Sequence, residues 1–187
     1  MSNSIDLLRG AVRDAESNYL QVTVDHLTLE TPCEGWDLRA LLNHVYSRMD
    51  LSTRAARLQP TEDFAIVEID HVGGDPAGAF TLLAGEMLAA WEECDDLVTP
   101  RVTPMGPIPP DGILLFGAQD VFIHAWDVAR ALSAEAVLSD EMIEVFTDTH
   151  KQSIDEQTRA MFFSDPVVID DDASALDKLV AFLGRQP

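Results

Sequence analysis

Positively charged residues are scarce in this chain. Twelve lysines and arginines stand against 33 aspartates and glutamates, which gives a formal net charge of -21. A charge of this sign repels the phosphate backbone of nucleic acids and the anionic surface of membranes. We therefore expect neither a nucleic acid nor a membrane as a partner. The acidic excess is explained most simply by a solvated surface.

Cysteines and long apolar runs are also few. Cys33 and Cys94 are far apart in the chain, so they fit neither a disulfide framework nor a CxxC metal or redox pair. No apolar run has the length that a transmembrane helix needs, and the first ten residues, MSNSIDLLRG, lack the basic-then-apolar layout of a signal peptide. These absences predict a cytoplasmic protein. With 187 residues, of which 47% are apolar, the chain has enough material for one globular domain.

The apolar residues that are present recur at helical spacing in four segments of the first two thirds. Asp37 is expected to cap the second helix, Asp75 followed by Pro76 to start the third, and Asp111 to cap the fourth. The segment DFAIVEID, residues 63–70, reads as a short strand or an extended loop, and the proline-rich segment 99–112 reads as a stiff loop. The four predicted helices run from residue 4 to about 26, from 38 toward a connector at 58–74, from 76 to about 97, and from 111 to 132.

After Ser133 the pattern predicts a helix from Ser139 to about Phe163, a short extended piece over DPVVIDDD, and a last helix over 173–183 closed by Gly184. We therefore predict an all-α fold, an up-down four-helix bundle with a short C-terminal extension of helices and one extended segment. Residues 1–187 are expected to form a single domain, with the bundle in 1–133 and the extension in 134–187.

The fourth predicted helix carries ionisable residues where a core helix is normally apolar. Asp120 and His124 lie one turn apart on one face, and Gly117 keeps that face thin. A buried carboxylate needs a cation, hydrogen-bond donors or a metal as a partner. With His44 from the second helix, the pair would make a two-imidazole, one-carboxylate ligand set that leaves a coordination position open. From spacing alone, a hydrogen-bonded core pair is the more common explanation of DxxxH.

Four neighbouring residues each have a functional and a plain structural interpretation. Asp127 is either an acceptor that orients an imidazole or a partner of Arg130 at the surface. Trp126 is more simply core packing than a substrate-stacking residue, and Cys33 more simply a small buried residue than a pocket residue. Arg39 is either the partner of a buried acid or a solvated first-turn residue.

The other residues that could have served a site are given structural interpretations. Trp36 is expected to pack at the base of the second helix. His26, His71 and His150 are interpreted as residues that bind no metal.

Three segments resemble a known family. TPCEGWDLRALLNHV resembles the entry to the second helix of the DinB-like metalloenzyme superfamily, in the branch of the mycothiol-dependent maleylpyruvate isomerase. DVFIHAWDVARAL resembles the carboxylate-xxx-His-x-Trp-Asp segment of the same branch. The ending VVIDDDASALDKLVAFLGRQP is similar to that of a short, largely uncharacterised actinobacterial subgroup. The similarity extends over most of the chain.

The resemblance implies a four-helix bundle that binds a divalent metal, usually zinc, with nickel, iron or manganese as alternatives. The matching positions for its ligands are His44, Asp120 and His124. Two departures matter: the isomerase has Glu where this chain has Asp120, and it has a larger second domain, whereas only some fifty residues follow the bundle here. Maleylpyruvate is therefore not adopted as the substrate.

The resemblance leads to an expected function. We expect a metal-dependent enzyme that acts on, or with, a low-molecular-weight thiol such as mycothiol, and that transfers the thiol to an electrophilic small substrate or isomerises that substrate. The alternatives are a metal-dependent hydrolase of a small substrate, and a non-catalytic bundle that binds a small molecule or a partner around a structural metal. Whether the protein forms a homodimer is left open by the sequence.

Overall fold

The structure is a computed structural model that describes residues 3–61 and 69–187. The chain divides into two compact units, residues 1–137 and residues 138–187. The first unit contains the four long helices, and the second contains three shorter ones. The prediction of an all-α fold with a helical C-terminal extension is therefore confirmed.

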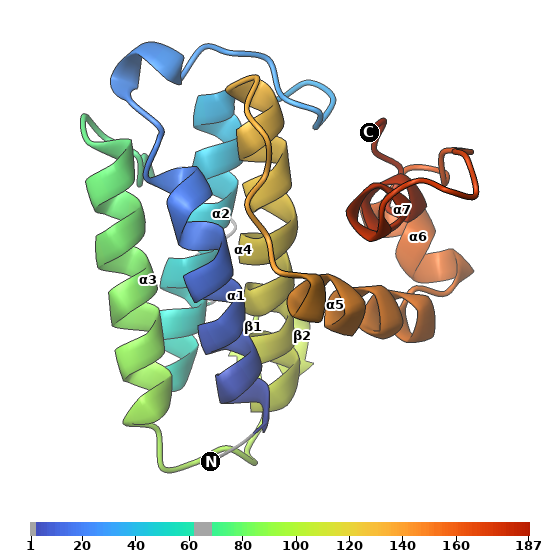
Figure 1. The fold of residues 1–187 in the computed structure, drawn as a ribbon. Coiled ribbons are helices and arrows are strands. Elements are labelled where there is room, and N and C mark those ends of the chain that lie inside the picture. Colours follow the sequence, from blue (N-terminus) through green and yellow to red (C-terminus); the bar gives the residue numbers. More distant parts are fainter. Residues whose placement is uncertain (1–2, 62–68) are drawn as a thin grey trace. The chain divides into compact units, whose positions relative to one another are not determined.

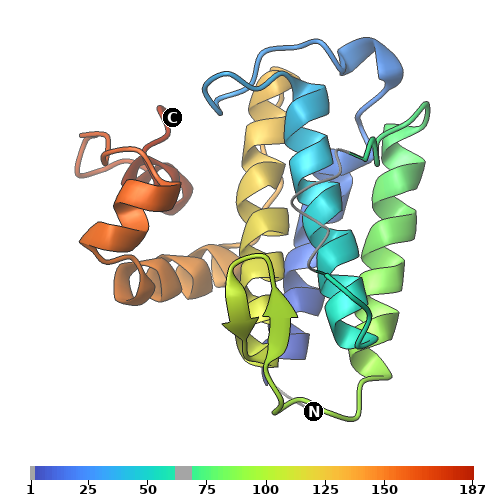
Figure 2. The ribbon, with the colours of Figure 1, turned by 180° about the vertical axis from the view of Figure 1, so that it is seen from behind.

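The first unit is a bundle in which each long helix packs against two others (Figure 1). Helix α1 contacts α3 and α4, and helix α2 contacts the same two helices. A 3-10 turn, η1, follows α1, and Figure 2 shows the small β-hairpin on the far side of the bundle. The elements of this unit are α1 (Asn3–Tyr19), η1 (Val24–His26), α2 (Leu38–Ala56), α3 (Pro76–Glu92), β1 (Arg101–Thr103), β2 (Gly106–Ile108) and α4 (Pro110–Ala131).

The helices of the bundle do not alternate strictly in direction. The Tyr46 hydroxyl donates to the carbonyl of Pro76 (2.8 Å), which joins the first half of α2 to the start of α3. Trp91 donates from Nε1 to the Ser52 hydroxyl (2.9 Å), which joins the ends of the same two helices. Helices α2 and α3 therefore run parallel, and the order of directions is up-down-down-up.

Two helix starts agree with the sequence and one does not. The side chain of Asp37 accepts from the backbone N–H of Ala40, and that of Asp75 from Gly78, so both caps are confirmed. The prediction that Asp111 caps α4 is wrong. Pro109 and Pro110 start the helix instead, because a residue in the first turn needs no N–H and proline already has a helical φ.

Three predicted helices were too long, each because local bonds compete with the next turn. Helix α1 ends at Tyr19, and Thr23 starts η1 with a capping box. Helix α3 ends at Glu92, and Asp96 accepts from the N–H groups of Val98 and Thr99. The predicted helix 139–163 is two helices, because Asp155 caps a new one through Thr158.

The proline-rich segment is a β-hairpin and not a plain loop. Strands β1 and β2 are antiparallel, with Arg101 opposite Ile108 and Thr103 opposite Gly106. Arg101 is 4% exposed and donates from Nε to the carbonyl of Ala55 at the end of α2. Strands of three residues are too short to show an alternating pattern in the sequence. The segment DFAIVEID, predicted as a short strand or an extended loop, falls almost wholly outside the described residues.

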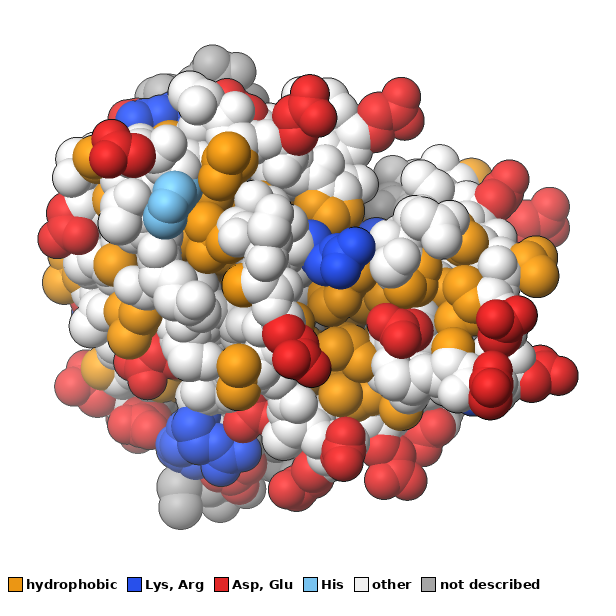
Figure 3. All heavy atoms as spheres, turned by 45° about the horizontal axis from the view of Figure 1, so that its top comes forward, with side chains coloured by type: hydrophobic (Ala, Val, Ile, Leu, Met, Phe, Trp, Pro, Cys, Tyr) orange, Lys and Arg blue, Asp and Glu red, His pale blue; other side chains and the backbone are white. Residues whose placement is uncertain are grey.

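The surface carries the acidic excess. Acidic side chains are spread over the face shown in Figure 3, and basic ones are few. Among the acidic residues that the structure describes, only Asp127 is fully buried (0% exposed). No described helix combines the length and the apolar character that crossing a bilayer requires.

The second unit contains α5 (Asp140–Ser153), α6 (Glu156–Phe162) and α7 (Ala175–Phe182). Arg159 donates to the carbonyls of Ser164 and Phe182, and its guanidinium lies over the Phe182 ring, 4.7 Å from the centroid. Gly184 has a φ of +85° and approaches Ser164 so closely that a Cβ would collide with its backbone. The predicted closure of the last helix by Gly184 therefore agrees with the structure.

His150 should make the stability of the second unit depend on pH. Its imidazole is 2% exposed, its Nδ1 lies 2.6 Å from the carbonyl oxygen of Phe146, and its ring faces Phe146 and Phe163. Burial lowers the pKa of His150, the Phe146 carbonyl acts against this, and Arg185 adds to the lowering. The folded state therefore binds fewer protons than the unfolded state below the ordinary histidine pKa of about 6.5, so stability is lost as pH falls through this region.

His150→Phe keeps a ring in this place but cannot titrate. We expect the free energy of unfolding of this variant, measured by denaturant titration between pH 7.5 and 5.5, to depend less on pH than that of the parent. Equal pH dependence in both proteins would contradict the assignment.

Candidate metal centre

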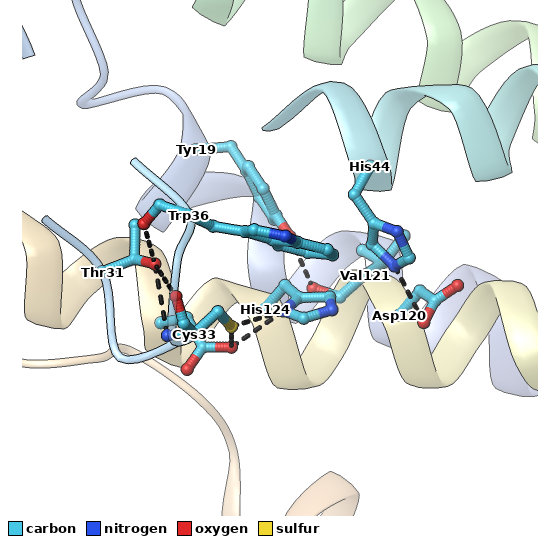
Figure 4. Close-up of polar contacts among 9 residues, drawn as sticks. Tyr19, Thr31, Cys33, Trp36, His44, Asp120, Val121 and His124 are labelled. Atoms are coloured by element: carbon cyan, nitrogen blue, oxygen red, sulfur yellow. Dashed lines mark hydrogen bonds and ion pairs between the residues drawn. The ribbon is translucent and has the colours of Figure 1, made fainter. Parts of the chain in front are cut away.

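Helices α2 and α4 bring three possible metal ligands together. The Nε2 atom of His44 lies 3.9 Å from Oδ1 of Asp120, and the imidazoles of His44 and His124 are 5.2 Å apart between centroids, at 80° to each other. One donor atom from each of these three residues lies within 4.8 Å of the other two. We call this group the His44–Asp120–His124 cluster. Figure 4 shows the two imidazoles and the carboxylate converging from the facing helices.

The arrangement follows from the antiparallel packing of α2 against α4. His44 lies on the flank of the buried stripe of Leu41, Leu42 and Val45, so its side chain reaches toward α4. Asp120 and His124 are one turn apart and therefore share a face. The Tyr19 hydroxyl donates to the carbonyl of Val121 (3.0 Å) and ties α1 to this turn of α4.

The cluster is partly open to solvent. The side chains of His44 and Asp120 are 24% and 29% exposed, and that of His124 is 11% exposed. Burial acts to raise the pKa of Asp120, but the imidazoles of His44 and His124 and the charge of Arg48 outweigh it, so the pKa lies below its ordinary value. Asp120 is therefore ionised at neutral pH and can act as an anionic ligand.

A second polar group lies on the other side of the His124 ring. Nδ1 of His124 is 2.8 Å from Oδ2 of Asp127, and Sγ of Cys33 is 3.4 Å from the same oxygen and 4.0 Å from Nδ1. Donor atoms of these three residues also lie within 4.8 Å of one another. We call them the Cys33–His124–Asp127 cluster. Asp127 is thus buried against His124, and Arg130 lies instead over the Trp126 ring (5.6 Å).

Cys33 and Trp36 reach the site from one tight turn. The N–H of Trp36 donates to the carbonyl of Cys33 (3.0 Å), and Gly35 between them has a φ of +79°. These features define a turn whose third residue favours glycine. The Thr31 hydroxyl donates to the carbonyl of Trp36 (2.8 Å) and holds the turn closed. The turn places the Cys33 thiol 4.0 Å from Nδ1 of His124, and Figure 4 shows the Trp36 ring beside the imidazoles of His44 and His124.

Trp36 is a site residue that the sequence did not reveal. Its ring centroid lies 4.9 Å from that of His44 and 6.5 Å from that of His124, and the residue is 37% exposed. Trp36 was expected to pack at the base of α2, and it lies instead beside the His44–Asp120–His124 cluster. The proximity of Trp36 to His44 in the sequence was the available signal, but the turn at Gly35 decides where the indole points.

The remaining predicted site residues lie elsewhere. Arg39 pairs with Asp70 (2.9 Å), with both side chains about half exposed. Trp126 is 4% exposed and belongs to the core. Gly117 does not border free space, because a Cβ added there would be in ordinary contact with Leu8, Met87 and Ser52 at 3.7–3.8 Å. The absence of a side chain at Gly117 therefore lets neighbouring helices pack closely against α4 and does not create a cavity.

Trp36 provides a spectroscopic test of where a metal binds. A paramagnetic ion such as Cu²⁺ in the His44–Asp120–His124 cluster would lie next to the indole and should quench its fluorescence. We expect Trp36→Phe to lose most of the quenching that Cu²⁺ causes in the parent, and Trp126→Phe to retain it. Quenching that survives in Trp36→Phe would place the ion away from this cluster.

Comparison with known proteins gives three findings. Residues 8–129 match the model of the mycothiol maleylpyruvate isomerase N-terminal domain. Uncharacterized proteins from two strains of Mycobacterium tuberculosis are 25% identical to this chain over 169 residues, which cover 88% of this chain and 87% of theirs. The crystal structure of the mycothiol-dependent maleylpyruvate isomerase matches with a TM-score of 0.60 and 17% sequence identity. The match covers 77% of this chain and 66% of the isomerase chain, which is just under two thirds of the isomerase.

Proposed function

Because the chain belongs to the family of the mycothiol maleylpyruvate isomerase N-terminal domain, with 122 matched residues from 8 to 129, we propose that it is a metal-dependent enzyme that uses a low-molecular-weight thiol. In this proposal His44, Asp120 and His124 hold one divalent ion, most simply zinc. The thiol adds to an electrophilic small molecule, and the outcome is either transfer of the thiol or isomerisation of the substrate. Mycothiol is the thiol that the family name suggests.

The observation that carries the proposal is the convergence of two imidazoles and one carboxylate from two helices. Imidazole nitrogen and carboxylate oxygen are both ligands that zinc accepts. Three protein ligands leave a fourth position for a substrate atom, which is the arrangement of catalytic zinc sites. Nickel, iron and manganese are compatible with the same donors. Since Asp120 is one methylene shorter than glutamate, its carboxylate reaches less far from the α4 backbone.

The net charge of the three side chains suits the binding of a thiolate to the metal. Two neutral imidazoles and one carboxylate contribute a single negative charge. A divalent ion held there would keep a net positive charge and would favour the thiolate form of a bound thiol, which is the nucleophile at neutral pH. The Trp36 ring lies beside both imidazoles, so a thiol bound at this site would lie close to an aromatic surface.

Asp127 sets the orientation of His124. Its buried carboxylate accepts from Nδ1–H of His124 at 2.8 Å, which leaves the lone pair of Nε2 directed toward His44 and Asp120. A metal-binding histidine commonly has a carboxylate partner of this kind, which makes the imidazole a stronger donor and holds its ring in place. Asp127 is therefore a positioning residue in this proposal.

The proposal is tested by measuring loss of free thiol in the presence of an electrophile. The full chain, loaded with zinc, is incubated with mycothiol or with a surrogate thiol and a panel of electrophilic substrates, and the same reactions are run after chelation and with His44→Ala. We expect thiol-dependent turnover that requires both the metal and His44. Turnover of a substrate without any thiol would assign the protein as a hydrolase. Stoichiometric metal without turnover across the panel would favour a structural or binding role.

A further inference from the structure

The strongest additional feature is the Cys33–His124–Asp127 cluster, which shares His124 with the proposed catalytic centre. It combines a sulfur, a nitrogen and an oxygen donor from the turn at Gly35 and from α4. A thiol alone would carry no argument, but here it lies 3.4 Å from a fully buried carboxylate that also touches the imidazole. The thiol donates to the Asp127 carboxylate, which argues against a nucleophilic role.

The distances suit a metal ion. Around a tetrahedral zinc ion with bonds of about 2.0–2.3 Å, neighbouring donor atoms lie roughly 3.3–3.7 Å apart. The observed separations are 3.4 Å between Cys33 and Asp127, 4.0 Å between Cys33 and His124, and 2.8 Å between His124 and Asp127. The last pair is at hydrogen-bond distance, so an ion replacing the shared proton would move these two atoms apart by about half an ångström.

The shared imidazole makes the two clusters mutually exclusive. Neutral histidine has one protonated ring nitrogen and one with a free lone pair. When Nδ1 carries the proton and donates it to Asp127, Nε2 is available to the His44–Asp120–His124 cluster. When Nε2 carries the proton, Nδ1 is available to the Cys33–His124–Asp127 cluster. One ion can therefore occupy either position, but His124 cannot serve both while it is neutral.

The donor types then select the ion. Thiolate prefers soft ions, whereas carboxylate and imidazole accept manganese and similar harder ions. We infer that Cys33, His124 and Asp127 form an alternative site for a thiophilic divalent ion, and that occupation of this site withdraws His124 from the proposed catalytic centre. The inference goes beyond the proposed thiol chemistry, with which it has only His124 in common.

The test uses cadmium as the thiophilic probe and manganese as the harder one, with the full-length protein freed of metal. Cd²⁺ should produce thiolate-to-metal charge-transfer absorption in the parent. Cys33→Ser should lose this absorption and bind Cd²⁺ at least about tenfold more weakly. Cys94→Ser is the matched control, because Cys94 donates to the carbonyl of Asp96 and lies in neither cluster, and it should retain both.

The converse variant separates this inference from the proposed function. His44→Ala should weaken Mn²⁺ binding by about tenfold or more and leave the Cd²⁺ absorption unchanged. Cd²⁺ should also displace Mn²⁺ from the parent, with one ion per chain in total. Loss of manganese binding alone would concern the proposed catalytic centre and would leave the cadmium result standing.

Three outcomes would overturn the inference: no thiolate absorption with Cd²⁺ in the parent, unchanged absorption in Cys33→Ser, or simultaneous binding of Cd²⁺ and Mn²⁺ to one chain. Alkylation of the parent gives a measurement that needs no variant. Bound Cd²⁺ should slow the reaction of Cys33 with iodoacetamide, detected by peptide mass spectrometry, and should leave the rate at Cys94 unchanged. Equal rates at Cys33 with and without Cd²⁺ would likewise overturn it.

Discussion

His124→Ala should reduce the divalent metal bound by the purified protein from about one ion per chain to background. His124 contributes one donor atom to each of the two clusters, so its removal leaves only two side chains in either of them. Two protein ligands are fewer than those of known catalytic zinc sites. The measurement is metal content by mass spectrometry after dialysis against a low concentration of zinc.

The same variant should also be less stable. Loss of the imidazole removes the 2.8 Å hydrogen bond to the buried Asp127 carboxylate, which costs about 1–3 kcal/mol. Loss of the bound metal ion, which binds only the folded state, lowers the free energy of unfolding by a further ~2.7 kcal/mol when the metal is present at a hundred times its dissociation constant. Addition of zinc should therefore raise the melting temperature of the parent and not that of the variant.

His71→Ala is the matched control for this experiment. His71 belongs to neither cluster of the described residues, and the hydrogen bond that involves its backbone N–H, to Asn43, does not depend on the imidazole. The control should keep full metal content. Full occupancy in His124→Ala would remove His124 from the site and with it both proposals.

Asp127→Asn should weaken zinc binding by about 10- to 100-fold while leaving the three ligands of the His44–Asp120–His124 cluster in place. The neutral amide is a weaker acceptor for Nδ1–H, so the imidazole loses basicity and the tautomer with the free Nε2 lone pair is less favoured. Since Asp127 has no exposed surface, water cannot replace the carboxylate. The measurement is competition with a chromophoric chelator at fixed pH.

Asp111→Asn provides the comparison on the same helix. Asp111 is exposed in the first turn of α4, so the change removes the same charge far along the helix from His124. Its zinc affinity should equal that of the parent. If both variants lost affinity equally, the effect of Asp127 would be one of net charge and not of its hydrogen bond to His124.

The sequence by itself determined much of the fold. Helical spacing of apolar residues and the capping side chains of Asp37 and Asp75 predicted the four long helices, because these signals act within one or two turns of the chain. The resemblance to the isomerase branch, carried by the segments around His44 and His124, is confirmed by the family match over residues 8–129. The ends of helices were less predictable, because Asp96 and Asp155 redirect the backbone through side-chain bonds that compete with the helix.

Only the tertiary structure decided how the candidate site is assembled. Spacing along α4 put Asp120 and His124 on one face, but the distance from His44 depends on the antiparallel packing of α2, which no local pattern encodes. The turn at Gly35 brings Cys33 and Trp36 to the site, although Trp36 had been interpreted as a packing residue and Cys33 as either a pocket residue or a small buried one. The burial of Asp127 against His124, and of Trp126 in the core, was likewise settled by packing. Contacts between residues far apart in sequence arise from the fit of whole helices, and that is why they required the structure.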